Sequence, residues 1–220
     1  MKVGWVYERL LAAFGPQGWW PGDGGAFEVA VGAVLTQNTA WRNVERALAG
    51  LREQGWLNPE GVRDAPVDAL GEAIRPSGYF NVKARRLQAL ATAWCDAGGE
   101  AGLAERDTAA LRRWLLGIKG VGRETADDVV VYGFGRPVFV VDAYTRRIFE
   151  RLGIATGDES YEALRESVEA DLGNGDGATT RLNEFHALLV ALGKDICRPR
   201  PVCPSCPLLN GCPTGRSSAY

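Results

Sequence analysis

The sequence predicts an all-α protein, and two observations carry this prediction. Apolar residues recur at spacings of three and four along most of the 220 residues, which is the period of one face of an α-helix. Only Val138 to Val141 reads as a strand, and a single run of four residues has no second strand with which to pair. The hydrophobic content of 46% is enough to bury a core, as one large domain or as two lobes in contact.

Apolar faces mark four helices in the first half of the chain. The first contains Leu10 and Phe14, and the second, through Val29 and Leu35, is apolar on nearly all sides and is therefore expected to be buried. A third helix has the apolar residues Val44, Ala47, Leu48 and Leu51. A fourth has the apolar residues Val82, Leu87, Leu90, Ala91 and Trp94. We expect three basic residues of this fourth helix to face water: Lys83, Arg85 and Arg86.

Further helix starts are marked by short oxygen-bearing side chains, which can accept hydrogen bonds from the unpaired amides of a first turn. Asp107 or Thr108 can cap a helix whose apolar residues are Leu111, Trp114 and Leu115. Later helices are expected to start near Asp142, Ser160 and Thr179.

The charge pattern limits the classes of function. The formal net charge of −2 argues against a protein that coats nucleic acid through bulk charge. The basic residues nevertheless form local groups, which are either solvated helix faces or a binding surface. No secretory signal and no apolar run near the ~20 residues of a membrane span is present, so a cytoplasmic protein without a membrane partner is expected.

One turn in the middle of the chain has the composition of a phosphate-binding hairpin. An apolar helix ends at Leu116, Gly120-Val121-Gly122 follows, and a second helix begins at once. Two glycines allow the backbone to approach a phosphate closely, while the new helix contributes its positive end. Glycines also make ordinary turns between helices, but Lys119 and Arg123 favour contact with a nucleic-acid backbone. The segment is therefore interpreted as a helix-hairpin-helix.

A single carboxylate follows the valine-rich run. Asp142 stands where an apolar segment ends and a helix starts, so it can be a helix N-cap. It can also be a carboxylate in a partly desolvated pocket, where it would stabilise positive charge on a sugar and orient or deprotonate water. The two roles are compatible.

Four cysteines near the C-terminus have the spacing of a metal-binding loop. Cys197, Cys203, Cys206 and Cys212 are separated by five, two and five residues, and the prolines between them prevent a helix. Structural zinc sites usually have two close pairs, whereas here only one C-x2-C pair exists. The spacing therefore favours a [4Fe-4S] cluster over zinc or disulfides.

The hairpin, the valine run with Asp142 and the cysteine loop, in this order, resemble the endonuclease III branch of the helix-hairpin-helix (HhH-GPD) DNA glycosylases. The resemblance covers roughly residues 27–212. It implies a two-lobed helical fold, double-stranded DNA with damaged bases as the partner, Asp142 as the catalytic aspartate and a structural [4Fe-4S] cluster. We expect a six-helix domain at 24–136 and a second lobe made of 1–23 and 137–220, with the cluster loop at 197–212. A monomer associated with the nucleoid is also expected.

The chain departs from the family pattern at two positions. The first gap between cysteines is one residue shorter than the commonest family spacing. More importantly, Glu124 stands where bifunctional members have a Schiff-base lysine. A carboxylate cannot form the imine that drives β-elimination, so little or no abasic-site (AP) lyase activity is expected. Lys119 could be a displaced nucleophile, but its place before the glycines favours phosphate contact.

The resemblance also gives expectations for the remaining site residues. Trp19-Trp20-Pro21 and the segment Leu35 to Trp41 look like an endonuclease III-related branch whose characterised members remove alkylated purines such as 3-methyladenine. Expected DNA-binding residues are Gln37, Lys119, Gly120, Val121, Gly122, Arg123 and Arg146. Expected base-pocket residues are Trp19, Trp20, Trp41 and Tyr144. The tryptophans could equally be core aromatics, and Gln37 could be a helix-terminus amide. His186, the single histidine, is expected to be a packing or hydrogen-bonded residue rather than a metal ligand.

Three hypotheses follow. The first is an alkylpurine DNA N-glycosylase, a hydrolase of N-glycosyl bonds with weak AP lyase activity at most. The second is an oxidised-pyrimidine glycosylase with AP lyase activity, as in endonuclease III. The third is a catalytically weak DNA-binding iron-sulfur protein. Glu124 separates the first from the second, and the presence of Asp142 weighs against the third.

Overall fold

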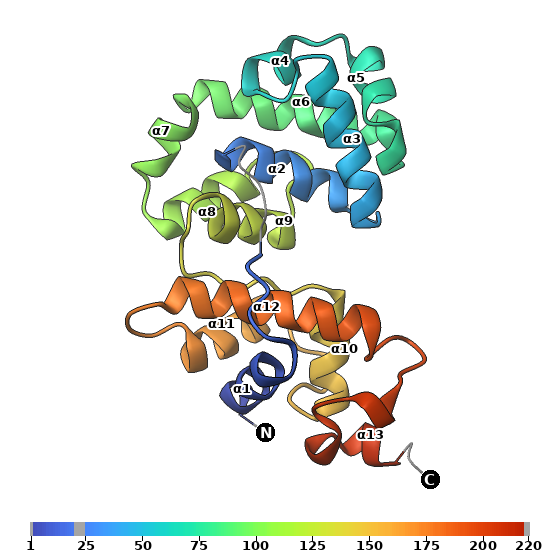
Figure 1. Ribbon diagram of the computed structural model, residues 1–220. Helices are drawn as coiled ribbons and strands as arrows, with labels where there is room; N and C mark the ends of the chain where they lie inside the picture. Colours follow the sequence, from blue (N-terminus) through green and yellow to red (C-terminus); the bar gives the residue numbers. More distant parts are fainter. Residues whose placement is uncertain (1, 20–24, 218–220) are drawn as a thin grey trace. The chain divides into compact units, whose positions relative to one another are not determined.

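The structure is a computed structural model that describes residues 2–19 and 25–217 (Figure 1). These residues are helical almost throughout and contain no β-strand, which confirms the all-α prediction. The segment Val138 to Val141 has no regular secondary structure, and its four side chains are buried. None of the described helices has the length and apolarity needed to cross a membrane.

The chain forms two compact units, each with its own core. Unit 1 consists of Met1–Pro21 and Pro137–Tyr220, and unit 2 is Gly22–Arg136. The described part of unit 1 has the helices α1 (Val3–Phe14), α10 (Ala143–Leu152), α11 (Tyr161–Leu172), α12 (Ala178–Asp195) and α13 (Pro213–Ser217). Short 3-10 turns at Cys203–Ser205 (η3) and Leu209–Gly211 (η4) lie between α12 and α13.

Unit 2 has eight α-helices within its described residues, rather than the six expected. These are α2 (Gly25–Thr36), α3 (Trp41–Glu53), α4 (Pro59–Asp64), α5 (Val67–Ala73), α6 (Phe80–Asp96), α7 (Gly99–Ala104), α8 (Thr108–Leu116) and α9 (Arg123–Asp128). A 3-10 turn, η1 (Arg75–Ser77), precedes α6, and a π-helical turn, η2 (Val129–Gly133), continues α9. Helices α4, α5 and α7, which no apolar face marks in the sequence, have one or two turns and are too short for apolar periodicity to reveal.

Helix α2 is the centre of unit 2, with α3, α6, α9 and η2 packed around it (Figure 1). Every residue from Ala26 to Leu35 is buried, as expected for a helix that is apolar on nearly all sides. Beside it, the Trp94 ring lies edge-on to Phe27 at 5.4 Å between centroids. The core of unit 2 therefore surrounds a fixed central helix whose C-terminal end leads to Gln37.

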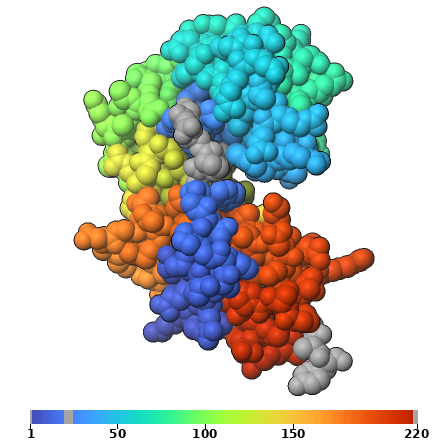
Figure 2. Space-filling view, in the orientation of Figure 1, coloured from blue at the N-terminus to red at the C-terminus, as the bar shows by residue number. Residues whose placement is uncertain are grey.

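The core of unit 1 lies between α1, α10, α11 and α12. Phe139 stacks on Phe185 with ring centroids 5.6 Å apart, and Phe149 lies 6.3 Å from the same ring. Helix α1 packs on α11 and α12, and Figure 2 shows it in dark blue on the surface of this unit. Burial of Phe139 in this core fixes the segment that leads to Asp142.

Candidate functional site

The hairpin of unit 2 is anchored from within and exposed at its tip. Ile118 and Val121 are each 8% exposed, and the Val121 amide donates to the Ile118 carbonyl at 3.1 Å. Below the turn, Arg112 of α8 donates twice to the fully buried carboxylate of Asp127 on α9, at 2.6 and 3.1 Å. The exposed residues of the turn are Lys119, Gly122, Arg123 and Glu124. The two helices are thus held together so that the turn presents a fixed backbone.

The two glycines of the turn differ in backbone conformation and in the space around them. Gly120 has a φ of +97°, and a Cβ there would lie 2.4 Å from Cγ of Arg86. Gly122 is the N-cap of α9 with a φ of −92°, and a Cβ there would have no atom within 4 Å. Gly120 is therefore required by the protein's own packing, whereas Gly122 leaves open space next to the first turn of α9.

Gln37 lies against this hairpin. Its Nε2 donates to the Gly120 carbonyl at 3.1 Å and to Oγ1 of Thr125 at 3.0 Å. Its Oε1 accepts from the Arg86 guanidinium, whose aliphatic part covers Gly120. The structure thus brings together two predicted DNA-binding segments that are 83 residues apart. It also adds Arg86, which the sequence indicated only as one member of a basic group.

Lys83 is not turned to water, and this prediction was wrong. The residue is 1% exposed, and its Nζ donates to the carbonyls of Leu35 and Ser77, both at 2.8 Å, and to Oγ1 of Thr39 at 3.0 Å. Burial, and then the nearby Arg86 charge, lower the pKa of Lys83 to about 8. Lys83 therefore links two segments: the loop that contains Gln37 and the turn that precedes α6.

Asp142 in unit 1 is both the cap of α10 and a buried carboxylate. Its Oδ1 accepts from the Thr145 amide at 2.7 Å and from the Thr145 hydroxyl at 2.8 Å. Its Oδ2 lies 3.6 Å from Nε2 of His186. The residue is 9% exposed, so one oxygen serves the helix while the other lies in a nearly dry environment.

The neighbours of Asp142 keep it ionised despite burial. Burial alone would raise the pKa of this carboxyl, but His186 and the hydrogen bonds from Thr145 outweigh it and hold the pKa below its ordinary value. The carboxylate is therefore anionic at neutral pH. An anionic oxygen in a poorly solvated position can stabilise positive charge that develops nearby.

His186 and Trp19 complete the surroundings of Asp142. The His186 imidazole is 5% exposed, and its centroid lies 5.7 Å from the Trp19 ring at an interplanar angle of 44°. Trp19 and Asp142 therefore contact the same imidazole, which links one predicted base-pocket residue to the predicted catalytic residue. The expected packing role of His186 is confirmed, but its contact with Asp142 was missed.

Other predicted residues of the site lie elsewhere. Tyr144 packs on Gly193 and stacks with the Arg147 guanidinium at 5.2 Å. Arg146 donates to the Glu159 carbonyl at 3.0 Å. Trp41 is the first residue of α3 and is half-buried. Trp20 lies outside the described residues. The DNA and base contacts expected of these four residues stay predictions.

The cysteine loop, red in Figure 2, closes around one small cavity that all four predicted ligand cysteines line. None of the five cysteines, all within the described residues, is in a disulfide. Burial raises the pKa of the Cys206 thiol, and the Cys197, Cys212 and Cys203 sulfurs close by also raise it. Among the described residues, no three Cys, His, Asp or Glu side chains are gathered as the ligands of one metal ion.

Two arginines of α10 hold this loop. Arg147 donates to the carbonyls of Cys197 at 2.9 Å and Gly193 at 3.0 Å. Arg151 donates to Sγ of Cys197 at 3.2 Å and to the carbonyls of Arg198 and Pro199. From the other side, the Gly215 amide donates to Sγ of Cys212 at 3.3 Å. Helix α10 thus carries Asp142 at its start and supports the cysteine loop with its later turns.

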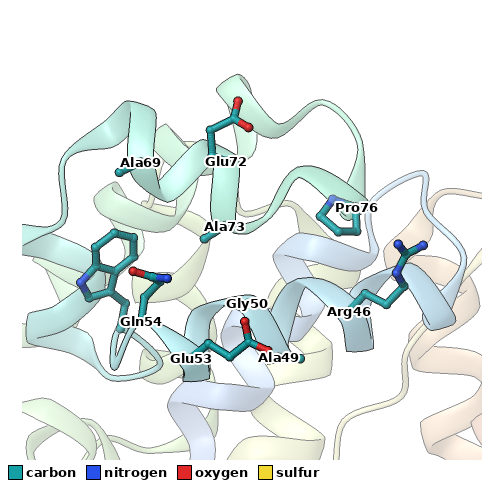
Figure 3. A pocket seen from close by; sticks show the side chains of 10 residues that line it. Arg46, Ala49, Gly50, Glu53, Gln54, Ala69, Glu72, Ala73 and Pro76 are labelled. Atoms are coloured by element: carbon teal, nitrogen blue, oxygen red, sulfur yellow. The ribbon is translucent and has the colours of Figure 1, made fainter.

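A separate cavity of about 770 Å³ lies on unit 2 between α3 and the α5 to η1 segment (Figure 3). None of the predicted site residues lines it. Its charged lining residues are Arg46, Glu53 and Glu72, and the two carboxylates do not favour an anionic ligand.

Comparisons with known proteins agree with this geometry. Residues 31–172 match the family model of the HhH-GPD superfamily base excision DNA repair proteins. A candidate DNA repair glycosylase of Methanocaldococcus jannaschii is 40% identical over 210 residues, which cover 94% of both chains. Endonuclease III of Thermotoga maritima is 32% identical and covers 84% of this chain and 82% of its own.

Solved structures of the same kind superpose over most of the chain. A trapped covalent endonuclease III–DNA intermediate has a TM-score of 0.84 at 25% identity and covers 100% of both chains. The 3-methyladenine DNA glycosylase of H. pylori, bound to 1,N6-ethenoadenine, has a TM-score of 0.77 at 29% identity and covers 88% of this chain and 98% of its own. With the hairpin and the buried aspartate in place on this fold, the chain belongs to the HhH-GPD superfamily of base excision repair DNA glycosylases.

Proposed function

We propose that this glycosylase removes damaged bases, alkylated purines in particular, by hydrolysis assisted by Asp142. The observation that carries this proposal is the ionised, buried carboxylate of Asp142 beside His186, whose imidazole lies 5.7 Å from the Trp19 ring. As the bond between base and sugar breaks, positive charge develops on the sugar, and an anion in a low-dielectric position stabilises it. Asp142 can also accept a proton from the attacking water.

The expected lack of AP lyase activity rests on Glu124. This residue is exposed in the first turn of α9, next to the open space at Gly122. A carboxylate there cannot attack the sugar carbon to form an imine, as a lysine amine does. Base release without strand cleavage is therefore the proposed outcome.

The choice of alkylated purines is supported by chemistry and by one relative. Cationic alkylpurines have a weakened glycosidic bond, and their charge is attracted to aromatic faces such as that of Trp19. A 3-methyladenine glycosylase is among the similar solved structures. Trp20, Trp41 and Tyr144 remain proposed base-pocket residues, each a candidate to stack on a flipped base.

DNA binding is assigned to the hairpin and to Gln37. The exposed backbone around Gly122, with Lys119 and Arg123 beside it, suits contact with a phosphate without reading sequence. Val121 anchors the turn from below, and Gly120 shapes it. Gln37 is proposed to fill the gap left by the flipped base, and Arg146 to contact the backbone.

We also propose that Cys197, Cys203, Cys206 and Cys212 hold a [4Fe-4S] cluster. The residues fit this group because four sulfurs line one cavity and two N–H donors, from Arg151 and Gly215, point at ligand sulfurs. Thiolate-bound clusters are anionic, and such donors stabilise them. When bound, the cluster supplies a cross-link for a loop that has only short turns of its own.

A second candidate function is an endonuclease III-type activity on oxidised pyrimidines with AP lyase. Its support is the identity of about a third to endonuclease III of Thermotoga maritima and of other organisms. Lys119 would then be the nucleophile, although it precedes Gly120.

One experiment separates the two functions. Purified protein is incubated with duplexes that contain 3-methyladenine, 7-methylguanine, thymine glycol, uracil or an abasic site. Release of alkylated purines without strand cleavage, abolished in Asp142→Asn, is expected. A strong borohydride-trapped adduct with the abasic duplex that is lost in Lys119→Ala would favour the second function. No processing of any lesion would contradict both.

A further inference from the structure

His186 is placed where it can act on Asp142. It lies on α12, which packs against α10, and its Nε2 is 3.6 Å from Oδ2 of Asp142, the N-cap of α10. Oδ1 already accepts two hydrogen bonds from Thr145. His186 therefore faces the one carboxylate oxygen that the helix cap does not use.

The surroundings of the imidazole restrict its orientation. The Phe139 ring lies 6.3 Å away at 88°, and the Trp19 ring lies at 5.7 Å. Oδ2 of Asp142, the N-cap of α10, lies 3.6 Å from its Nε2. Glu184, two positions earlier on α12, is also buried. Glu184 instead accepts from the amides of Gln17 and Gly18. The Asp142 carboxylate thus lies beside the imidazole, whereas the Glu184 carboxylate is engaged by backbone amides.

We propose that His186 is a positioning residue for Asp142: it fixes the direction of Oδ2 and favours its ionised form, which leaves a lone pair of this oxygen available to the sugar or to water. This inference rests on the proposed catalytic role of Asp142. His186 acts through the carboxylate and is not required to touch the nucleotide. Because both groups are buried, their interaction is only weakly screened by salt.

The first test uses the fact that His186 is the only histidine of the chain. In protein free of any affinity tag and labelled at histidine, one set of imidazole NMR signals reports this residue alone. The chemical shifts of the imidazole nitrogens are compared in the wild type and in Asp142→Asn at the same neutral pH. Because Oδ2 of Asp142 lies 3.6 Å from Nε2, loss of the carboxylate charge is expected to change the Nε2 signal. Identical Nε2 signals would overturn the inference, whatever the enzyme's activity.

The second test measures base release in a single turnover, with the lesion of the above panel that the wild type processes fastest. His186→Gln keeps a hydrogen-bonding group but removes the imidazole. Its rate at neutral pH is expected to fall by about tenfold to a hundredfold, as for a coupled pair. Burial raises the pKa of Asp142 and the imidazole lowers it, so the pKa should rise when the imidazole is removed. The acid limb of the pH–rate profile then moves to higher pH.

A double-mutant cycle and a packing control separate positioning from structure. In the Asp142→Asn background, His186→Gln should cause no further loss of rate, because its route to the reaction is already removed. Phe185→Leu disturbs the core beside His186 and should lower the melting temperature without moving the acid limb. An acid limb that moves equally in Phe185→Leu and His186→Gln would overturn the inference.

The outcomes distinguish the two levels of proposal. If Asp142→Asn releases the base as fast as the wild type, the proposed function fails. If Asp142→Asn is inactive while His186→Gln keeps the wild-type rate and acid limb, only the role of His186 fails.

Discussion

Asp142 has two carboxylate oxygens that face different neighbours, and this division explains how one residue can serve structure and chemistry. Oδ1 closes the first turn of α10 through Thr145, a contact typical of an N-cap. Oδ2 faces His186 in an almost dry position. An asparagine would retain the cap but not the charge. Asp142→Asn therefore tests chemistry with little disturbance of the helix.

Lys83 is a second residue whose charge is enclosed by the protein. We predict that Lys83→Met lowers the free energy of unfolding by about 1–3 kcal/mol, because the acceptors Leu35 and Ser77 lose a buried donor. The measurement is denaturant unfolding at pH 7. Arg85→Met is the matched control, since Arg85 is an exposed basic residue of the same helix and its loss should change stability by less than about 0.5 kcal/mol.

The stability contribution of Lys83 should also depend on pH. Its pKa is about 8 in the folded protein and 10.5 ordinarily, so between these values the unfolded chain binds a proton that the folded chain has lost. Stability then rises with pH through this window. The wild type should gain stability relative to Lys83→Met between about pH 8 and 10.5. A difference that stays constant over this range would contradict the lowered pKa.

Residue-scale predictions from sequence succeeded where the chemistry is local and failed where the partner is distant. Lys83 continues the spacing of Leu87, Leu90 and Trp94 on the buried face of α6, while Val82 is 47% exposed. Lys83 was predicted to face water because its side chain is charged. The carbonyls of Leu35 and Ser77 that accept its hydrogen bonds cannot be identified from a sequence pattern. His186 was recognised as a packed residue, but Asp142, 44 positions earlier, could not be identified as its neighbour.

At the scale of elements, the hairpin offers a matched pair of glycines. We predict that Gly120→Ala lowers the free energy of unfolding by at least about 1 kcal/mol, because φ is +97° and the new Cβ would overlap Arg86. Gly122→Ala should keep or slightly raise stability, since φ is −92° and the space is open. Thermal unfolding of both variants measures the difference.

The same pair tests the proposed phosphate contact. A methyl group at Gly122 would occupy the open space next to the α9 N-terminus, so Gly122→Ala should weaken binding to a duplex with a stable abasic-site analogue although the protein remains fully folded. Fluorescence anisotropy measures the affinity. If Gly122→Ala binds DNA like the wild type, the phosphate does not approach at this position.

Helix starts were predictable because their chemistry lies within four residues. The Asp107 carboxylate accepts a hydrogen bond from the Ala110 amide at 2.6 Å, and the Ser160 hydroxyl accepts one from the Ala163 amide at 3.1 Å. Helix α12 begins after Gly177, close to the expected Thr179. By contrast, the short helices α4, α5 and α7 have too few apolar residues to show a period, so they were missed.

At the scale of the whole molecule, the family and the all-α fold were predictable from the order of three motifs. The resemblance also predicted a lobe made of 1–23 and 137–220, but no motif shows which helix faces meet within it. In unit 1, α1 packs on α11 and α12, which lie far along the sequence. Such contacts depend on the complementary shapes of apolar faces. Leu10 and Phe185 lie in the same core, but their apolar character is common to many residues and does not identify the partner of each.

The cysteine loop is the part of unit 1 that has least secondary structure of its own, so its order should depend on the proposed cluster. We predict that Cys203→Ser loses iron and visible absorbance and lowers the melting temperature, because the loop then lacks a ligand. Cys95→Ser is the matched control: Cys95 is a half-buried thiol of unit 2 and should keep full iron content. Loss of iron in both variants, or in neither, would contradict the assignment.

The overall charge decides how the molecule can hold DNA. With a net charge of −2, binding cannot come from bulk attraction and must rest on few phosphate contacts, so the logarithm of affinity should fall only shallowly with the logarithm of salt concentration. Lys119→Ala and Arg123→Ala should each reduce this slope by about 1. Arg63→Ala removes an equal charge that is paired with Asp64, and should leave the slope unchanged. A slope that falls equally in all three variants would mean that net charge, rather than the hairpin, holds the DNA.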